Sequence, residues 1–241
     1  ENKDIDTSFS YSPLMNKFDL ITGCSTGSLI MALLAKGYKA KDIPSIYEKW
    51  GPIIFNNSLL SNDKEINNSL LNRLLNLLKS KIGLAPTFDK EKLFNVAETL
   101  VAGAYNVEIQ TKSLKENERL NLPELLVPLY DVIKDELVIV SSLETELSMA
   151  EVVVASSCFP SVFSACNLNI NGEESLYMDG GIAISNPALL GIANALNKGF
   201  NLEDIRLVSI GTGNNVVNIT QDLALNKGKL NWMSKLPSLL H

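Results

Sequence analysis

The sequence predicts a three-layer α/β/α fold with a mostly parallel central sheet, because segments of strand and helix character alternate along most of the chain. The clearest pair lies near the start, where residues 18–22 are predicted to be a short buried strand ending at Gly23 and the helical segment 28–36 ends at Gly37. In such folds, loops at the carboxyl ends of the strands form the sites. The 241 residues are expected to form one domain, 1–241.

The later elements carry their own boundary signals. A helix capped by Asp42 is predicted to run to Trp50 and to stop at Gly51-Pro52. The remaining predictions, in chain order, are a helix over 89–102, strands over 106–111 and 137–142, a helix over 152–157 opened by the capping box Ser148-x-x-Glu151, a strand over 175–178, a helix from Asn186-Pro187 to Gly199, and a strand over 206–210.

Segment 66–82 is predicted to be an amphipathic helix, because its apolar residues recur at helical spacing and its other face is polar. Two roles stay open for it. Packing on the sheet is what the stripe of any core-facing helix indicates. A lid or membrane-contact surface is the alternative, since Arg73, Lys79 and Lys81 would suit anionic headgroups.

Composition excludes several classes of function. A net charge of −6 gives a nucleic-acid role no electrostatic support. One histidine cannot build an imidazole site for a metal, and the three cysteines show no metal-binding spacing such as C-x-x-C. Sparse cysteines fit a reducing compartment and no apolar run reaches about 20 residues. A cytoplasmic location, peripheral at membranes, is therefore expected, and a secreted or effector role stays open.

Residues 23–27, Gly-Cys-Ser-Thr-Gly, match the pattern G-x-S-x-G between a strand and a helix, the context of a nucleophile elbow. Gly23 and Gly27 would permit the tight turn that exposes the Ser25 hydroxyl. The following helix directs its N-terminus at the site, and the Thr26 N–H is the natural first oxyanion donor. The alternative is a plain turn of small residues.

A serine nucleophile needs a base, and the chain has only one histidine, His241, at its last position. Terminal residues are usually poorly ordered, so the base is expected to be a carboxylate or a lysine. Asp179 is the best candidate, since it ends a predicted strand at the same sheet edge as Ser25. Gly180 and Gly181 follow it and permit close backbone approach. A plain Asp-Gly turn is the alternative.

These two motifs, in this order, resemble the Ser–Asp dyad motifs of the patatin-like phospholipases. The likeness covers about residues 18–213 and includes the segments 48–55, 155–163, 186–188 and 209–213. The resemblance implies a three-layer α/β/α fold and hydrolysis of acyl esters in phospholipids, lysophospholipids or galactolipids without calcium or cofactor. It also implies that Ser25 attacks the carbonyl to form an acyl-enzyme and that Asp179 accepts the proton and later activates water.

One departure from the family concerns its glycine-rich loop, which follows the first strand and supplies oxyanion N–H groups. Residues 1–17 contain no glycine. We therefore expect that strand and loop to be missing: they lie upstream of Glu1, were cut away, or the protein is catalytically impaired. A binding or regulatory domain is thus the second hypothesis. An acyltransferase ranks last, because such enzymes commonly pair serine with histidine.

The partners expected of an active enzyme are a phospholipid or lysophospholipid substrate and, transiently, a membrane surface. The sequence carries no signal for oligomeric state.

Overall fold

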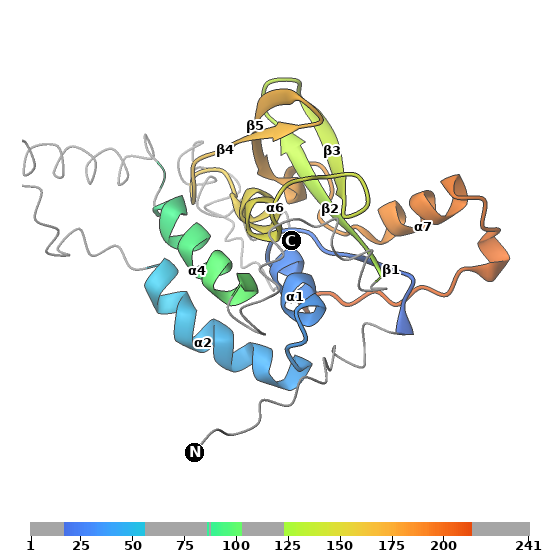
Figure 1. The fold of residues 1–241 in the computed structure, drawn as a ribbon, viewed down its shortest axis with the longest axis horizontal. Coiled ribbons are helices and arrows are strands. Elements are labelled where there is room, and N and C mark those ends of the chain that lie inside the picture. Colours follow the sequence, from blue (N-terminus) through green and yellow to red (C-terminus); the bar gives the residue numbers. More distant parts are fainter. Residues whose placement is uncertain (1–16, 56–85, 87, 103–122, 214–241) are drawn as a thin grey trace, which may run out of the picture.

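The computed structural model describes residues 17–55, 86, 88–102 and 123–213 (Figure 1). The predicted helix over 66–82 and the predicted strand over 106–111 lie outside these residues. Within them, a sheet is covered by helices, and the predicted α/β class is confirmed.

The sheet is mixed. Its strands are β1 (Leu20–Thr22), β2 (Glu124–Asp131), β3 (Glu136–Ser141), β4 (Cys166–Ile170) and β5 (Glu173–Asp179). β1 pairs with β2 in parallel, whereas the pairs β2–β3, β2–β5 and β4–β5 are antiparallel. The expectation of a mostly parallel sheet is therefore wrong for the described strands.

Two hairpins are the physical reason for this difference, because strands joined by a tight turn can only run antiparallel. β4 and β5 are joined by Asn171 and Gly172 alone, both with positive φ, 56° and 89°. An Asn-Gly pair at these angles is a common two-residue hairpin turn, so the sequence held a signal for this hairpin. β2 and β3 are joined by residues 132–135, where Asp135 has a φ of 58°.

Strand β2 lies at the centre of the sheet, and its two edges are used differently. β3 occupies one edge, from Leu126 to Asp131. The other edge is shared: β1 pairs with residues 124–126, and β5 pairs with residues 129–131. Since β1 is parallel and β5 antiparallel to β2, the two strands run towards each other. Their carboxyl ends meet beside Pro128.

Pro128 explains how a proline is accommodated in a central strand. Its carbonyl points to the shared edge, where it accepts a hydrogen bond from the Ser156 hydroxyl at 3.0 Å rather than from a strand. The ring nitrogen of the same residue faces this edge too, where neither β1 nor β5 has a paired residue. A proline in a central strand usually removes one hydrogen bond between strands, because it has no N–H to donate. Pro128 removes none, since no strand pairs with it at this edge.

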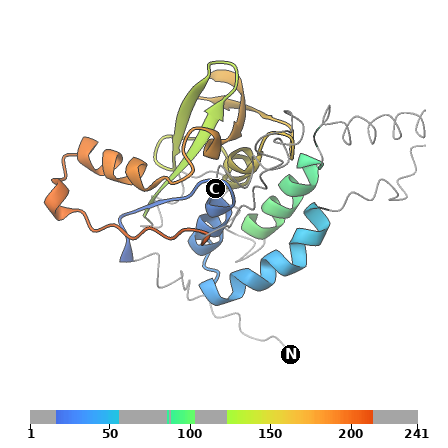
Figure 2. The same ribbon diagram turned by 180° about the vertical axis from the view of Figure 1, so that it is seen from behind.

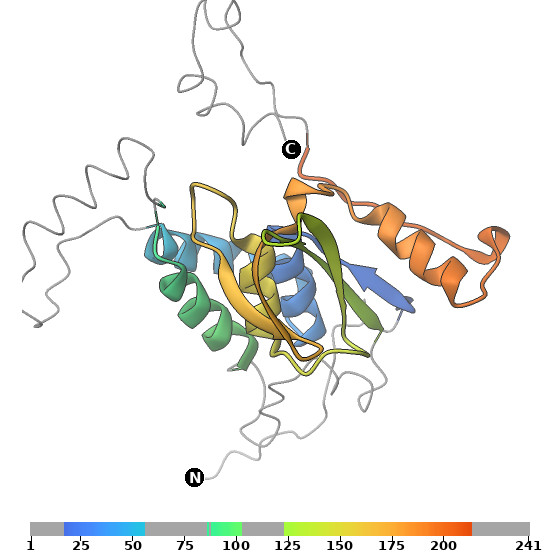
Figure 3. The same cartoon turned by 90° about the horizontal axis from the view of Figure 1, so that it is seen from above.

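Helices cover both faces of the sheet, namely α1 (Thr26–Ala35), α2 (Ile43–Ile54), α4 (Lys90–Ala102), α6 (Met149–Ser157) and α7 (Ala188–Asn197). α6 packs on β2, β4 and β5 and is itself covered by α1 and α4, with α2 against α4. α7 packs against β1, and its Leu190 and Ala193 line a small cavity with Leu126 of β2. Figure 3 shows α2 and α4 on one side of the strands and α7 on the other, and the view from behind agrees (Figure 2).

The main core lies between the sheet and α6. Alternate residues of β2, Leu125, Val127 and Leu129, are each at most 1% exposed and face this side. Val152 and Val153 of α6 are buried equally well. Each such side chain contributes about 1.5–3 kcal/mol of transfer free energy, so this layer holds β2 and α6 in fixed relation.

Two helix boundaries test the sequence signals. The capping box of α6 is confirmed: the Ser148 hydroxyl accepts from Glu151 N at 3.2 Å, and the Glu151 carboxylate accepts from Ser148 N at 2.7 Å. The predicted stop at Gly51-Pro52 is wrong, since α2 continues to Ile54. Ile54 is buried in the core, and its burial offsets much of the roughly 3 kcal/mol that an interior proline costs.

The predicted strand over 206–210 is also wrong, because these residues pair with none of the described strands. Ile210 is 91% exposed and Val208 is 64% exposed. An apolar extended segment becomes a strand only when a neighbour takes up its N–H and C=O groups.

No helix in the described ranges is both long and apolar enough to span a bilayer.

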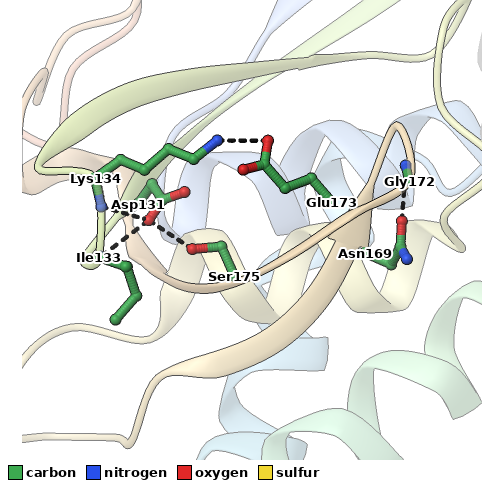
Figure 4. A network of polar contacts seen from close by, with 7 residues as sticks. All are labelled: Asp131, Ile133, Lys134, Asn169, Gly172, Glu173 and Ser175. Atoms are coloured by element: carbon green, nitrogen blue, oxygen red, sulfur yellow. Dashed lines mark hydrogen bonds and ion pairs between the residues drawn. The ribbon is translucent and has the colours of Figure 1, made fainter.

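Buried Asp131, the last residue of β2, hydrogen-bonds both to the turn that follows β2 and to β5 (Figure 4). Its Oδ1 accepts hydrogen bonds from the N–H groups of Ile133 and Lys134, at 2.9 and 3.0 Å, and from the Ser175 hydroxyl at 2.7 Å. Burial alone would raise the pKa of Asp131, but these hydrogen bonds outweigh it and hold the pKa below its usual value. Lys134 also pairs with Glu173 across the hairpin end, at 2.6 Å.

Candidate active site

The turn after β1 is strained at one residue. The ladder extends one residue beyond the strand, because Gly23 N donates to Leu126 O at 3.2 Å. Ser25 then adopts φ 54° and ψ −130°, and α1 begins at Thr26. A non-glycine residue in such a region costs about 1–3 kcal/mol and persists only where its surroundings enforce it. This is the conformation expected of a nucleophile elbow.

The glycines of the two motifs are not equivalent. A Cβ at Gly23 would lie 2.5 Å from Gly27 O, and one at Gly180 would lie 2.2 Å from Pro128 O. A Cβ at Gly181 would come within 3.0 Å of the Asp179 carboxylate. Gly27 differs, because a Cβ there would meet nothing within 4 Å. Close approach therefore explains Gly23, Gly180 and Gly181, and does not explain Gly27.

The structure brings Ser25 and Asp179 into direct contact, since the Ser25 hydroxyl donates to Asp179 Oδ2 at 2.6 Å. This is the short distance of a hydrogen bond to a carboxylate. Asp179 is 1% exposed, and its Oδ1 accepts from Gly181 N at 2.8 Å. Its own N–H donates to Cys158 O at 3.1 Å. Hydrogen bonds thus hold Asp179 at both carboxylate oxygens and at its backbone N–H.

The route by which the two residues meet differs from the expected one. We expected Ser25 and Asp179 to follow strands whose ends lie side by side at one sheet edge. Instead, β1 and β5 end head-on against β2, and the two residues face each other across the short interval at Pro128. The predicted proximity is correct, and the antiparallel direction of β5 is what changes the geometry.

The peptide N–H groups around Ser25 differ in whether they can still donate a hydrogen bond to another group. The Ser25 N–H is already used, because it donates to the Ser156 hydroxyl at 3.0 Å. Thr26 is the first residue of α1, and the N–H of a first helical residue has no acceptor within the helix. The residue is also exposed. It lies at the positive end of the helix dipole, where negative charge is favoured.

Two further serines contact the elbow, and neither was expected from the sequence to have a role. Ser156, in the last turn of α6, is fully buried and bonds both the Ser25 N–H and the Pro128 carbonyl. Ser28 is also fully buried and donates to Ser25 O at 2.6 Å. Ser28 follows the motif within one turn and could have been suspected. No spacing rule connects Ser156, 131 residues away, with Ser25.

Cys24, beside the elbow serine, is positioned as a thiol rather than a thiolate. Its Sγ lies 3.4 Å from Ile184 O and 3.9 Å from Asp179 Oδ1, to which it can donate. Burial, and then the charge of Asp179, raise the pKa of Cys24 to about 12. Because the thiolate is the reactive form, this cysteine is a poor nucleophile at neutral pH. Within the described ranges, no cluster of three or more His, Cys, Asp or Glu side chains could hold a metal ion.

The model of the family "Patatin-like phospholipase" matches residues 11–192, a range that contains Ser25, Ser156 and Asp179. Patatin-like protein 2 of Arabidopsis thaliana is 25% identical over 253 aligned residues, covering 92% of this chain and 56% of that protein. This chain thus spans little more than half the length of that relative.

Among solved structures, VipD from Legionella pneumophila aligns with a TM-score of 0.43 and 18% identity, over 70% of this chain and 41% of that one. The family match alone covers well over half of the chain and decides the assignment. The chain belongs to the patatin-like phospholipase family.

Proposed function

We propose that this protein hydrolyses acyl ester bonds of phospholipids or lysophospholipids, with Ser25 as nucleophile and Asp179 as base. The observation that carries the proposal is the 2.6 Å hydrogen bond from the Ser25 hydroxyl to Asp179 Oδ2, made from a strained turn at the start of a helix. Membership of the patatin-like phospholipase family supports the same class of reaction.

In the acylation step, Ser25 Oγ attacks the ester carbonyl carbon while its proton passes to Asp179 Oδ2. The tetrahedral intermediate then collapses, the bond to the alcohol breaks, and the proton on Asp179 goes to the leaving oxygen. The hydrogen bond from Gly181 N to Asp179 Oδ1 supports this role, because it leaves Oδ2 directed at the serine.

In the deacylation step, water takes the place of the alcohol. Asp179 accepts a proton from the water as the water oxygen attacks the acyl carbon. The proton then returns to Ser25 Oγ when the bond between Oγ and the acyl carbon breaks. The same carboxylate therefore serves both halves of the cycle, and no imidazole is required.

The negative charge that develops on the carbonyl oxygen needs donors. We assign the Thr26 N–H as one, since it begins α1 and has no helical partner, and the helix dipole adds to it. The Ser25 N–H is not a donor in this proposal, because Ser156 occupies it. Removing one such donor typically costs about 10²–10³ in rate, so Thr26 is a substantial contributor.

Fatty-acid release from phosphatidylcholine vesicles and lysophosphatidylcholine micelles tests the proposal, with Ser25→Ala and Asp179→Asn beside the wild type. Each variant is expected to lose about 10³-fold or more in rate, because neither residue of a dyad works alone. A fluorophosphonate probe should label the wild-type protein at Ser25 and should label neither variant.

Asp131→Asn is the matched control for Asp179→Asn, because it alters the other fully buried aspartate of the β2–β5 pair without touching the elbow. It should retain the wild-type rate while folded. A folded wild-type protein that releases no fatty acid and resists the probe would refute the enzyme proposal, and a binding or regulatory domain would then be the better account.

We propose transient contact with a membrane surface, and a cytoplasmic protein that is peripheral at membranes. Ile182, three residues after Asp179, is 37% exposed and is a candidate contact for an acyl chain or lipid surface. Flotation with phosphatidylcholine vesicles, comparing wild type and Ile182→Ser, checks this part separately from turnover.

A further inference from the structure

The conformation of Ser25 requires restraint, and the structure supplies it at each polar group of the residue. The hydroxyl donates to Asp179, the carbonyl accepts from Ser28, and the N–H donates to Ser156. Since an unsupported residue at φ 54° and ψ −130° would relax to a commoner backbone conformation, these three contacts together hold the elbow in shape.

The three restraints differ in origin. Ser28 belongs to the same helix as the elbow and moves with it, so its bond fixes only local geometry. Asp179 is the reacting partner in the proposed mechanism. Ser156 comes from α6, a different element of the core, and ties Ser25 to the rest of the fold without being part of the reacting pair.

The Ser156 hydroxyl bonds to two different parts of the fold. Its side chain is fully buried, and one hydroxyl both accepts from Ser25 N and donates to Pro128 O, each at 3.0 Å. These two bonds use the single proton of the hydroxyl and fix its direction. They connect the elbow, helix α6 and the central strand at the point where β1 and β5 end.

Pro128 makes the arrangement specific. Its carbonyl lies at the interval between β1 and β5, where no strand donor reaches it, so the Ser156 hydroxyl takes the place of a ladder bond. Gly180 also packs on this carbonyl, because a Cβ there would lie 2.2 Å from the oxygen. The anchor for Ser25 and the turn that carries Asp179 thus rest on the same peptide group.

We infer that Ser156 is a positioning residue, which sets Ser25 relative to Asp179 by holding the Ser25 N–H against the central strand. This inference rests on the proposed function. Removing the hydroxyl leaves the Ser25 N–H and the Pro128 carbonyl without their partner. The elbow can then rotate, and a misplacement on the order of 1 Å costs about 10²-fold in rate.

Steady-state kinetics on lysophosphatidylcholine micelles test the role in the full chain. Ser156→Ala is expected to lower kcat by about 10–100-fold and to leave KM within about two-fold, because the residue does not touch the substrate. Ser156→Cys should give the same loss. Its side chain is similar in shape but is a weak donor and acceptor, so it removes the hydrogen bonds without opening a cavity.

Ser142→Ala is the matched control. Ser142 is another fully buried serine whose hydroxyl accepts a backbone N–H of β2, from Leu125 at 2.9 Å, on the edge of β2 that β3 occupies and opposite the edge that β1 and the elbow use. It should lose a similar amount of thermal stability and keep kcat within about two-fold. Loss of kcat shared by Ser156→Ala and Ser142→Ala would reduce the effect to general destabilisation and overturn the inference.

Amide hydrogen exchange provides a second readout that does not depend on turnover. The Ser25 amide should exchange about ten-fold faster in Ser156→Ala, and at the wild-type rate in Ser142→Ala. If the wild type is active and Ser156→Ala matches it in kcat and in Ser25 exchange, the inference is wrong and the proposed function stands. If the wild type neither turns over nor labels with fluorophosphonate, the proposed function fails and the positioning role fails with it.

Discussion

Replacing Gly23 by alanine should damage both the fold and the activity, and the structure gives the size of the effect. The added Cβ would lie 2.5 Å from Gly27 O, 2.8 Å from Gly27 C and 2.9 Å from Ser28 Cα. All three are backbone atoms of α1, so no side chain can move aside. The helix start must shift by something on the order of 1 Å to restore ordinary contact distances.

Two costs follow from that shift. Overpacking of this kind typically costs about 1–3 kcal/mol in the free energy of unfolding. The shift also moves Ser25 away from its 2.6 Å contact with Asp179, so kcat should fall by about 10²-fold. Urea denaturation of the purified variant measures the first, and fatty-acid release under saturating substrate measures the second.

Gly27→Ala is the informative comparison, because both glycines belong to the same motif. A Cβ at Gly27 meets nothing within 4 Å, and the residue lies in the first turn of α1. Alanine there should be neutral or stabilising by up to about 1 kcal/mol, since glycine is a poor helix former. Equal damage from Gly23→Ala and Gly27→Ala, or a Gly23→Ala protein with wild-type stability and kcat, would refute the steric argument.

Three other predictions concern separate groups. Asp131→Asn should lower the melting temperature at pH 7 by about 5 °C, because two backbone N–H groups and Ser175 lose a charged acceptor. Since the pKa of Asp131 is lowered in the folded protein, its stabilisation should be complete above its ordinary pKa of about 3.9. It should disappear as the pH falls through the lowered value, so the melting curves of variant and wild type should converge in acid and not in base. Cys24, with its pKa raised to about 12, should react with iodoacetamide at pH 8 far more slowly than a free cysteine peptide; equal rates would contradict its burial as a thiol. Gly180→Ala should lose both stability and activity, because its Cβ would lie 2.2 Å from Pro128 O, and a variant with wild-type melting temperature and kcat would show that this peptide can move freely.

Local signals in the sequence were reliable where a short stretch of chain decides the structure. The elbow after β1, the capping box at Ser148 and the turn after Asp179 each depend on residues within about one turn of one another. Side-chain chemistry and backbone freedom at those positions act without help from distant residues. The same locality let the two motifs indicate the family that the comparison then confirmed.

Errors arose where a neighbour distant in sequence decides the outcome. Strand β2 was not predicted, and it contains Pro128, which a central strand accommodates only where the position without an N–H faces an interval between two other strands. The segment 206–210 has strand composition but pairs with no described strand. Pro52 ends many helices, yet buried Ile54 extends α2 beyond it.

The sequence by itself determined that a serine would stand on a strained turn at a helix N-terminus, and that an aspartate would end a strand before two glycines. Those features are built by adjacent residues. Only the tertiary structure decided that β1 and β5 end head-on beside Pro128, that 2.6 Å separates Ser25 Oγ from Asp179 Oδ2, and that Ser156 anchors the elbow. Each of these depends on strand direction and on packing between elements more than 100 residues apart, which local sequence patterns do not encode.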